Sequence, residues 1–218
     1  MPVVGDTILV ATRNAGKVRE FTLAFSALGL QVKSLADYPL IPDVEEDGET
    51  FLENAFKKAM TVAEALRIPV LADDSGLAVE RLNGEPGVYS ARYAGEHGND
   101  EANNARLINN LQALKADSEQ YVLADGEEAV GLSAAQFVCA LVLYDPNTKQ
   151  SYEAVGTCDG VIVEQPRGNY GFGYDPHFYV PSYERTMAEL APEEKQRISH
   201  RGEALRLLMQ RLSLGVGH

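Results

Sequence analysis

The sequence has no tryptophan, only two cysteines and few basic residues. Among its 218 residues, 19 Lys and Arg stand against 32 Asp and Glu, which gives a net charge of −13 at pH 7. A surface of this sign repels the backbone of a nucleic acid, so we expect no nucleic-acid partner. Cys139 and Cys158 lie in strand-like stretches. We expect both to be buried thiols in a reducing compartment rather than a disulfide.

Long apolar runs are also missing. No stretch approaches the roughly 18 apolar residues that a membrane-spanning helix needs, so we expect no membrane partner. Residues 1–6 have no basic region ahead of an apolar one, which argues against a signal peptide. Together these absences predict a cytoplasmic protein. A small phosphorylated ligand stays compatible with the acidic chain, because a bound Mg²⁺ offsets the repulsion locally.

Strand and helix patterns alternate along the chain. The predicted strands cover residues 8–11, 31–35, 70–72, 137–144 and 151–163. Helices are expected directly after the first strand, from the capping-box pattern Thr50-Phe51-Leu52-Glu53, from a cap at Asp100 and from Ser199 onward. This order predicts an α/β fold with a mixed, partly parallel twisted sheet flanked by helices. We expect two lobes with an active-site cleft between them.

Length and composition favour one domain over residues 1–218. Residues 115–134 are polar and acidic and lack a clear period. They are therefore predicted to form a surface excursion from that domain.

The first chemical signal follows the first strand, at Thr12-Arg13-Asn14-Ala15-Gly16-Lys17. A strand that turns through a glycine-containing loop into a helix points backbone N–H groups and the positive end of the helix dipole at one place. Lys17 adds a point charge suited to phosphate. The spacing differs from the Walker loop, and an ordinary turn is the alternative. The loop indicates a site for a phosphate ester.

The strongest signal is Ala72-Asp73-Asp74-Ser75-Gly76, where two carboxylates follow a buried strand. Ligands bind at this end of strands in open α/β sheets. Because side chains alternate along a strand, one carboxylate is expected to serve the site directly and the other to support it. Such a carboxylate can hold Mg²⁺ or orient a water. The alternative is a helix cap.

Several weaker signals accompany these two. The acidic stretch Glu45-Glu46-Asp47 is either a solvated charge run or the source of a second metal ligand. Gly171-Phe172-Gly173-Tyr174-Asp175-Pro176 interleaves glycines with aromatics, which suits close approach to a flat ligand or a core plug. Lys195 and the pair His200-Arg201 are candidate donors to such a ligand, and each alone reads as an ordinary polar residue. Lys58 shares a helix face with Asn54.

These motifs together resemble those of the inosine/xanthosine triphosphate pyrophosphatase family. The resemblance runs from about residue 8 to residue 212 and leaves the 115–134 excursion outside it. It also rests on Gly48-Glu49-Thr50-Phe51-Leu52-Glu53-Asn54-Ala55 and Ile198-Ser199-His200-Arg201-Gly202. The resemblance implies a Mg²⁺-dependent homodimer. It also implies hydrolysis of non-standard purine nucleoside triphosphates, such as ITP, dITP and XTP, to the monophosphate and pyrophosphate.

The resemblance further implies roles for particular residues. Asp74 would be the general base and a metal ligand, with Glu45 as the second metal ligand and Glu46 as the alternative to it. Thr12, Arg13, Asn14, Ala15, Gly16 and Lys17 would hold the triphosphate, and Ser75 would touch the substrate. The nucleoside pocket would be formed by Phe172, Gly173, Tyr174, Asp175, Lys195, His200 and Arg201. Arg13 departs from the family, which more often has glycine there.

Two other functions stay open at this point. One is a nucleotide-binding regulatory module with the same cradle but no turnover. The other is a pyrophosphatase for different modified nucleotides. The intact carboxylate and purine-pocket motifs favour the first-named activity, in which a small nucleoside triphosphate is the partner.

Overall fold

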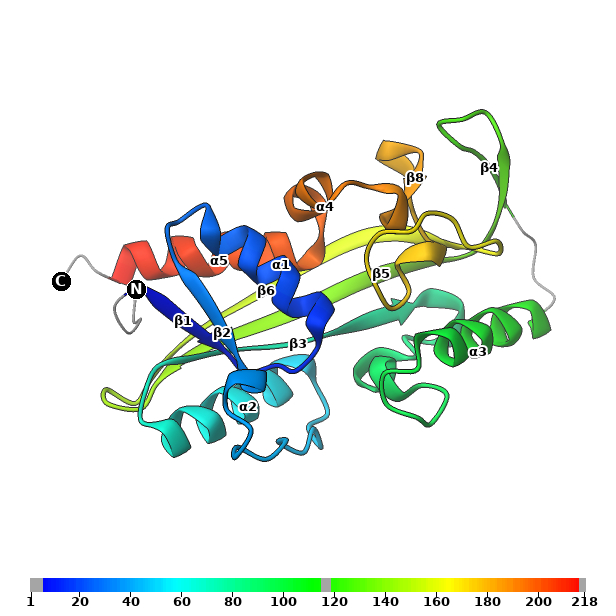
Figure 1. Ribbon diagram of the computed structural model, residues 1–218. Helices are drawn as coiled ribbons and strands as arrows, with labels where there is room; N and C mark the ends of the chain where they lie inside the picture. Colours follow the sequence, from blue (N-terminus) through cyan, green and yellow to red (C-terminus); the bar gives the residue numbers. More distant parts are fainter. Residues whose placement is uncertain (1–5, 115–118, 216–218) are drawn as a thin grey trace. The chain divides into compact units, whose positions relative to one another are not determined.

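The computed structural model describes residues 6–114 and 119–215 (Figure 1). Its α-helices are α1 (Ala15–Ser26), α2 (Phe51–Leu66), α3 (Asp100–Ala113), α4 (Pro192–Ile198) and α5 (His200–Gly215). Its strands are β1 (Thr7–Val10), β2 (Gln31–Ser34), β3 (Val70–Val79), β4 (Glu119–Val122), β5 (Glu128–Asp145), β6 (Gln150–Val163), β7 (Phe178–Val180) and β8 (Arg185–Thr186).

The described strands form one sheet in the order β2-β1-β3-β5-β6-β7-β8, with β4 paired to β5. β1 pairs in parallel with both β2 and β3. The pairs β4–β5, β6–β7 and β7–β8 are antiparallel. The predicted α/β class, with a mixed and partly parallel sheet flanked by helices, is confirmed.

The chain divides into two compact units. The first holds the residues up to Asp74, Cys139–Gly156 and the residues from His200 on, and the second holds Ser75–Val138 and Thr157–Ser199. The chain passes from one unit to the other within β3, β5 and β6 and again between Ser199 and His200. A single domain over residues 1–218 and a cleft between two lobes both stay predictions.

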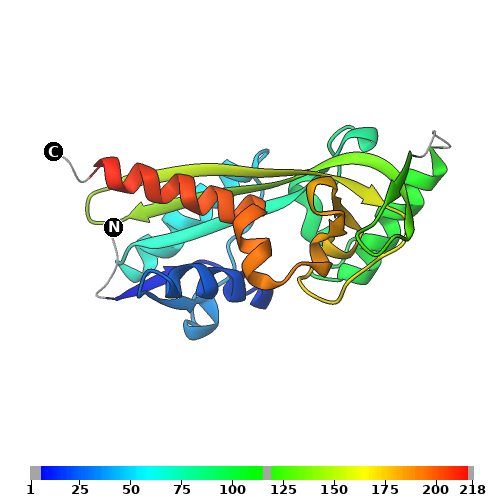
Figure 2. The ribbon, with the colours of Figure 1, turned by 90° about the horizontal axis from the view of Figure 1, so that it is seen from above.

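In the first unit, alternate residues of each strand build two apolar cores. Val10, Leu71 and Leu141 face α1 and α5, where the buried helix side chains include Phe21, Phe25, Leu205, Leu208 and Leu212. Leu9 and Ala72 face α2 on the other side (Figure 1). α5 lies against β6 (Figure 2), because Gly156 has no side chain: a Cβ there would stand 2.2 Å from the backbone nitrogen of Ala204. The strand pattern therefore fixes which helix each buried side chain meets.

The second unit has its own core beneath α3. Leu107 and Leu111 of α3 pack with Leu77, Phe137 and Phe178, which belong to three different strands. The rings of Phe137 and Phe178 lie 4.3 Å apart between centroids. This core supports the loop that precedes β7.

The structure corrects the prediction for residues 115–134. Residues 115–118 lie outside the described part of the chain, but β4 pairs with the start of β5, with Val122 opposite Glu128. Ala129, Gly131 and Ser133 are buried at alternate positions of β5. Small side chains carry little hydrophobic signal, so the sequence hid this alternation.

Two smaller expectations also change. The cap of α3 is Asn99, and Asp100 is the first helical residue. Cys139 is buried as expected, whereas Cys158 is half-buried. No helix in the described ranges combines the length and the apolar character that crossing a bilayer requires. The prediction about a signal peptide concerns residues 1–6, of which residues 1–5 lie outside the described part.

Candidate active site

β3 carries Asp73 and Asp74 in its interior and continues to Val79. The sequence placed both carboxylates after the end of a strand at Ala72, and this was wrong, as was the alternative of a helix cap. The strand continues because each carboxylate meets charged or amide partners on its own face of the sheet, so neither is buried without compensation. The predicted alternation is confirmed: the two side chains point to opposite faces.

On the face toward α1 and α5, Asp73 is fully buried among donors. Its Oδ2 accepts hydrogen bonds from Arg201 Nε at 3.2 Å and Nη2 at 3.0 Å, and from Cys139 Sγ at 3.3 Å. Its Oδ1 pairs with the ammonium group of Lys17. Arg201 also pairs with Glu20 of α1. Burial alone would raise the pKa of Asp73, but the positive charges of Arg201 and Lys17 outweigh burial and hold that pKa far below its ordinary value.

On the face toward α2, two side chains of that helix, Asn54 and Lys58, connect Asp74 to the loop that precedes the helix. Asn54 Nδ2 donates to Asp74 Oδ2 at 3.1 Å. Lys58 Nζ lies 3.7 Å from Asp74 Oδ1 and 2.7 Å from Glu46 Oε1. The amide of Asn54 is held in turn by Gly48, whose N–H donates to Asn54 Oδ1 at 2.8 Å. A Cβ on Gly48 would lie 2.7 Å from that oxygen, so this close approach requires glycine.

The pKa of Asp74 moves in the direction opposite to that of Asp73. Burial raises the pKa of Asp74, and the negative charges of Glu46 and Asp73 add to the rise against Lys58 and Lys17. A carboxylate with a raised pKa is a better proton acceptor than an ordinary aspartate. Asp74 is therefore a candidate general base.

The acidic loop contributes Glu46 to this cluster. Glu45 is exposed, whereas Glu46 is half-buried and bonded to Lys58. The sequence preferred Glu45 and kept Glu46 as the alternative. Because a charge run gives no clue to which side chain turns inward, only the partner on α2 distinguishes them.

The Thr12–Lys17 loop has the predicted form of a helix N-terminus. Asn14 caps α1, since its Oδ1 accepts from the Lys17 N–H at 3.1 Å, and Thr12 Oγ1 accepts from the Asn14 N–H at 3.1 Å. Ala15 and Gly16 form the first turn of α1. The Arg13 side chain instead contacts the segment that follows β2. There it pairs with Asp43 at 2.8 Å and donates to the carbonyl oxygens of residues 35 and 41. Its contacts are those of a loop anchor.

In the second unit, the loop at residues 171–175 closes on a buried ion pair. Lys195 Nζ donates to Asp175 Oδ2 at 2.5 Å, and the Phe172 N–H donates to the same oxygen at 2.9 Å. The ammonium group also stands 5.0 Å from the centroid of the Phe172 ring. Gly171 has φ +81°, and a Cβ there would lie 2.0 Å from Asp175 Oδ2. Tyr174 OH donates to the Ser90 carbonyl at 2.8 Å.

The remaining predicted residues lie as follows. Ser75 directly follows Asp74 on β3 and is half-buried. His200 is buried at the first position of α5. The guanidinium of Arg201, expected at a nucleoside base, is bonded to Asp73 and Glu20. The structure thus brings Lys17, Asp73 and Arg201 together in the first unit, and it groups Phe172, Asp175 and Lys195 in the second.

Sequence reasoning missed several members of these clusters. Asn54 and Lys58 carried a signal, because residues four apart share a helix face, and both meet Asp74. Glu20 and Cys139 carried none, since their partners stand far away in the sequence. Hydrogen bonds between segments that are distant in the sequence depend on tertiary packing, and local sequence patterns do not predict them.

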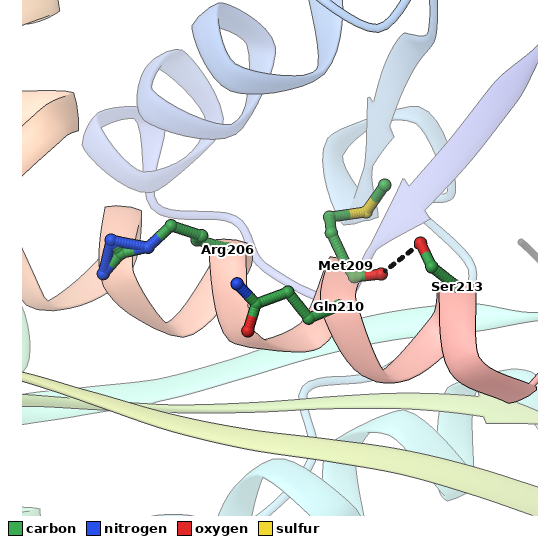
Figure 3. Close-up of a pocket in the computed structure, with 4 residues that line it drawn as sticks. All are labelled: Arg206, Met209, Gln210 and Ser213. Atoms are coloured by element: carbon green, nitrogen blue, oxygen red, sulfur yellow. Dashed lines mark hydrogen bonds between the residues drawn. The ribbon is translucent and has the colours of Figure 1, made fainter.

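A separate cavity of about 520 Å³ lies beside α5 and is lined by Arg206, Met209, Gln210 and Ser213 (Figure 3). Ser213 Oγ donates to the Met209 carbonyl at 2.9 Å, as in an ordinary helix turn. This lining contains no carboxylate and no nucleophile with a base beside it. The candidate active site is the charged cluster on β3, where carboxylates, lysines and an arginine converge.

Comparison with known proteins supplies independent findings. A family model described as the Ham1 family matches residues 8–211. The chain is 49% identical over 210 residues to a dITP/XTP pyrophosphatase of Geobacillus kaustophilus, covering 96% of each chain. It is 47% identical over 205 residues to a protein of the same name from Geobacter sulfurreducens, covering 94% of this chain and 96% of that one. Among solved structures, the Staphylococcus aureus Ham1 protein is similar with a TM-score of 0.75 and 42% identity, covering 95% of this chain and 98% of that one.

The buried ion pair between Asp73 and Arg201 predicts that an Arg201→Met variant loses stability and that the loss depends on pH. Removing one partner of a buried pair costs roughly 3–5 kcal/mol, and we expect a loss of that size in the free energy of unfolding at pH 7. Because the folded pKa of Asp73 is lowered, its stabilisation is complete above the unfolded pKa of about 3.9 and is lost as the pH falls below that value. The difference between the proteins should therefore shrink by about 1 kcal/mol at pH 3.

Urea unfolding in EDTA at pH 7 and pH 3 measures this difference. Arg206→Met is the matched control, because Arg206 lies on the same helix in an exposed pair with Glu203. We expect the control to lose less than about 1 kcal/mol. Equal losses for the two variants, or a loss from Arg201→Met that is the same at both pH values, would contradict the assignment.

Proposed function

Because the chain belongs to the Ham1 family, we propose that it hydrolyses non-standard purine nucleoside triphosphates (dITP, ITP and XTP) to the monophosphate and pyrophosphate. The observation that carries the proposal is the pair of adjacent carboxylates on β3 with opposite pKa shifts. The cations around Asp73 lower its pKa and keep it ionised. Asp74 lies beside Lys58 and Glu46, and its pKa is raised. Removal of deaminated bases from the nucleotide pool is the corresponding biological role.

In this proposal, the N-terminus of α1 binds the triphosphate. The N–H groups of Ala15 and Gly16 in the first turn of α1 and the hydroxyl of Thr12 lie at one helix end, which attracts anions. The Lys17 ammonium adds a full positive charge and is itself held by Asp73. Arg13 supports the cradle indirectly, through the loop that it anchors.

Asp74 acts on the water. It accepts a proton from a water that attacks the α-phosphorus, the bond from the α-phosphorus to the bridging oxygen breaks, and pyrophosphate leaves with its charge held by Lys17 and the loop amides. Lys58 stays protonated in this position: burial would lower its pKa, but Asp74 and Glu46 raise it. Ser75, the next residue on the strand, is proposed to touch the substrate.

The donor set near Asp74 suits Mg²⁺. Hard divalent cations take carboxylate oxygens, and here the carboxylates of Asp74 and Glu46 lie on either side of the Lys58 ammonium group. In the described ranges, no three His, Cys, Asp or Glu side chains form a cluster that could hold a metal ion. We assign the metal ligands to Asp74 and Glu46, in place of Glu45. When bound, Mg²⁺ neutralises the triphosphate and polarises the phosphorus.

The loop at residues 172–175 and Lys195 are proposed to contact the purine, with His200 as a further donor. Hypoxanthine and xanthine carry a 6-oxo group that accepts hydrogen bonds, whereas adenine carries an amino group that leaves buried donors unpaired. Such a mismatch can reject a substrate by roughly 10⁴-fold. The contacts of Arg201 favour a role in holding Asp73, and its proposed contact with the base stays a prediction.

The expected test is pyrophosphate release from a panel of nucleotides. Purified protein with saturating Mg²⁺ should release pyrophosphate from ITP, dITP and XTP far faster than from ATP, GTP or dUTP. Tight binding of ITP without pyrophosphate would instead identify a regulatory module. Preference for dUTP would identify a pyrophosphatase for other modified nucleotides.

In the same assay, Asp74→Asn should lower kcat for ITP at least about 10³-fold, because asparagine cannot take a proton from water. The fold should survive with little change in melting temperature, since asparagine keeps the volume and can accept the Asn54 hydrogen bond. Asp159→Asn on an exposed position of β6 is the control and should leave kcat unchanged. A folded Asp74→Asn protein within tenfold of wild type would sink the assignment.

We further propose that the protein works in the cytoplasm as a homodimer with isologous contacts and without a nucleic-acid partner. Sedimentation equilibrium at micromolar concentration should give twice the 23.7 kDa mass of one chain. A mass of one chain would reject the dimer.

A further inference from the structure

Both backbone polar groups of Gly173 are held by one turn of α3. The Gly173 N–H donates to Asp100 Oδ2 at 2.7 Å, and the Gly173 carbonyl accepts from Asn104 Nδ2 at 2.9 Å. Asp100 and Asn104 are four residues apart and therefore lie on one face of the helix. Two side chains from a distant segment thus fix one glycine between Phe172 and Tyr174.

This contact complements the one on the inner side of the same loop. There, Asp175 accepts hydrogen bonds from the Phe172 N–H and from the ammonium group of Lys195. Asp175 is buried, and Lys195 also lies against the Phe172 ring. The Phe172 backbone is held by Asp175 from inside, and the following peptide is held by α3 from outside.

The loop needs such support because its glycines allow many conformations. Gly173 has φ +63°, and glycine populates positive and negative φ values about equally readily. No intrinsic preference of the chain selects the observed form. The two hydrogen bonds from α3 contribute to that selection, together with the hydrogen bond from the Phe172 N–H to Asp175.

Asn104 carries a cost that its loop contact explains. Its Nδ2 donates to the carbonyls of both Asp100 and Gly173, which orients the amide. Its Oδ1 is then buried, and no donor among the described residues reaches it. A buried acceptor without a partner lowers stability, and natural proteins retain such costs at functional positions.

We propose that Asp100 and Asn104 are positioning residues that set base specificity by holding the Gly173 peptide. The inference rests on the proposed function, in which residues 172–175 contact the purine. With the clamp in place, the loop is organised before the base arrives, and binding does not have to order it. Without the clamp, contacts with the base weaken while phosphate binding at α1 is unaffected.

Asn104→Asp tests the clamp at nearly constant volume, because a carboxylate cannot donate to the Gly173 carbonyl. KM for ITP should rise about tenfold, as expected for one lost hydrogen bond with a carbonyl left unpaired. kcat should stay within about twofold, since the change removes binding and not transition-state contacts. The preference for ITP over ATP should fall by a similar factor. Inhibition by inorganic tripolyphosphate, which has no base, should be unchanged.

Asn109→Asp is the matched control, with the same substitution on the same helix at an exposed position. It should behave as wild type in every assay. At the other end of the clamp, Asp100→Asn keeps an oxygen that accepts the Gly173 N–H and should retain a low KM. Asp100→Leu removes that oxygen and should raise KM as Asn104→Asp does.

The outcomes separate this inference from the function on which it rests. Wild-type protein that releases no pyrophosphate from ITP would reject the proposed function and the inference with it. An active wild type with Asn104→Asp indistinguishable from Asn109→Asp would overturn the inference alone. Equal losses in ITP turnover and tripolyphosphate inhibition, with a lowered melting temperature, would also overturn it, because they indicate support of the fold only.

Discussion

The alternation of side chains along β3 is the constraint on which the candidate site depends. Two consecutive carboxylates in an extended strand cannot share an environment, because their side chains leave opposite faces of the sheet. One face is covered by α1 and α5 and the other by α2. Asp73 therefore meets Arg201, Lys17 and Cys139, whereas Asp74 meets Asn54 and Lys58. A shift of one residue in the strand would exchange the two environments.

The two environments divide the work between chemically identical groups. Asp73 is stabilised as an anion and in turn holds Lys17 at the N-terminus of α1, where the triphosphate is proposed to bind. Asp74 keeps a raised pKa because burial and the negative charges of Glu46 and Asp73 outweigh the positive charges of Lys58 and Lys17. A permanent anion and a proton acceptor thus arise from adjacent residues through packing alone. Pairs of titratable groups whose environments separate their pKa values are characteristic of acid–base sites.

The sequence predicted the local parts of this arrangement better than the long-range ones. The turn from β1 into α1, the capping box at Thr50 and Glu53 and the alternation at Asp73 and Asp74 depend on neighbouring residues, and the structure confirms them. The full length of β3 was missed because two consecutive carboxylates indicate the end of a buried strand, and their cationic partners cannot be identified from local sequence. The proposed choice of Glu46 over Glu45 depends on the ion pair between Glu46 and Lys58, and the hairpin of β4 and β5 depends on small residues with weak patterns. The contacts of Arg201 with Glu20 and Asp73 join segments more than a hundred residues apart in the sequence, beyond the reach of any local pattern.

The central claim is that neighbouring carboxylates on one strand have opposite pKa shifts. Carbon-13 NMR of protein labelled at the aspartate carboxyl groups tests it directly, with Asp73→Asn and Asp74→Asn spectra used to assign the two signals. In metal-free protein, the Asp74 signal should titrate above the ordinary aspartate pKa of about 3.9, and the Asp73 signal should show no protonation down to the lowest pH at which the protein stays folded. Two signals that titrate together near the ordinary value, or an Asp73 signal that titrates above that of Asp74, would contradict the account.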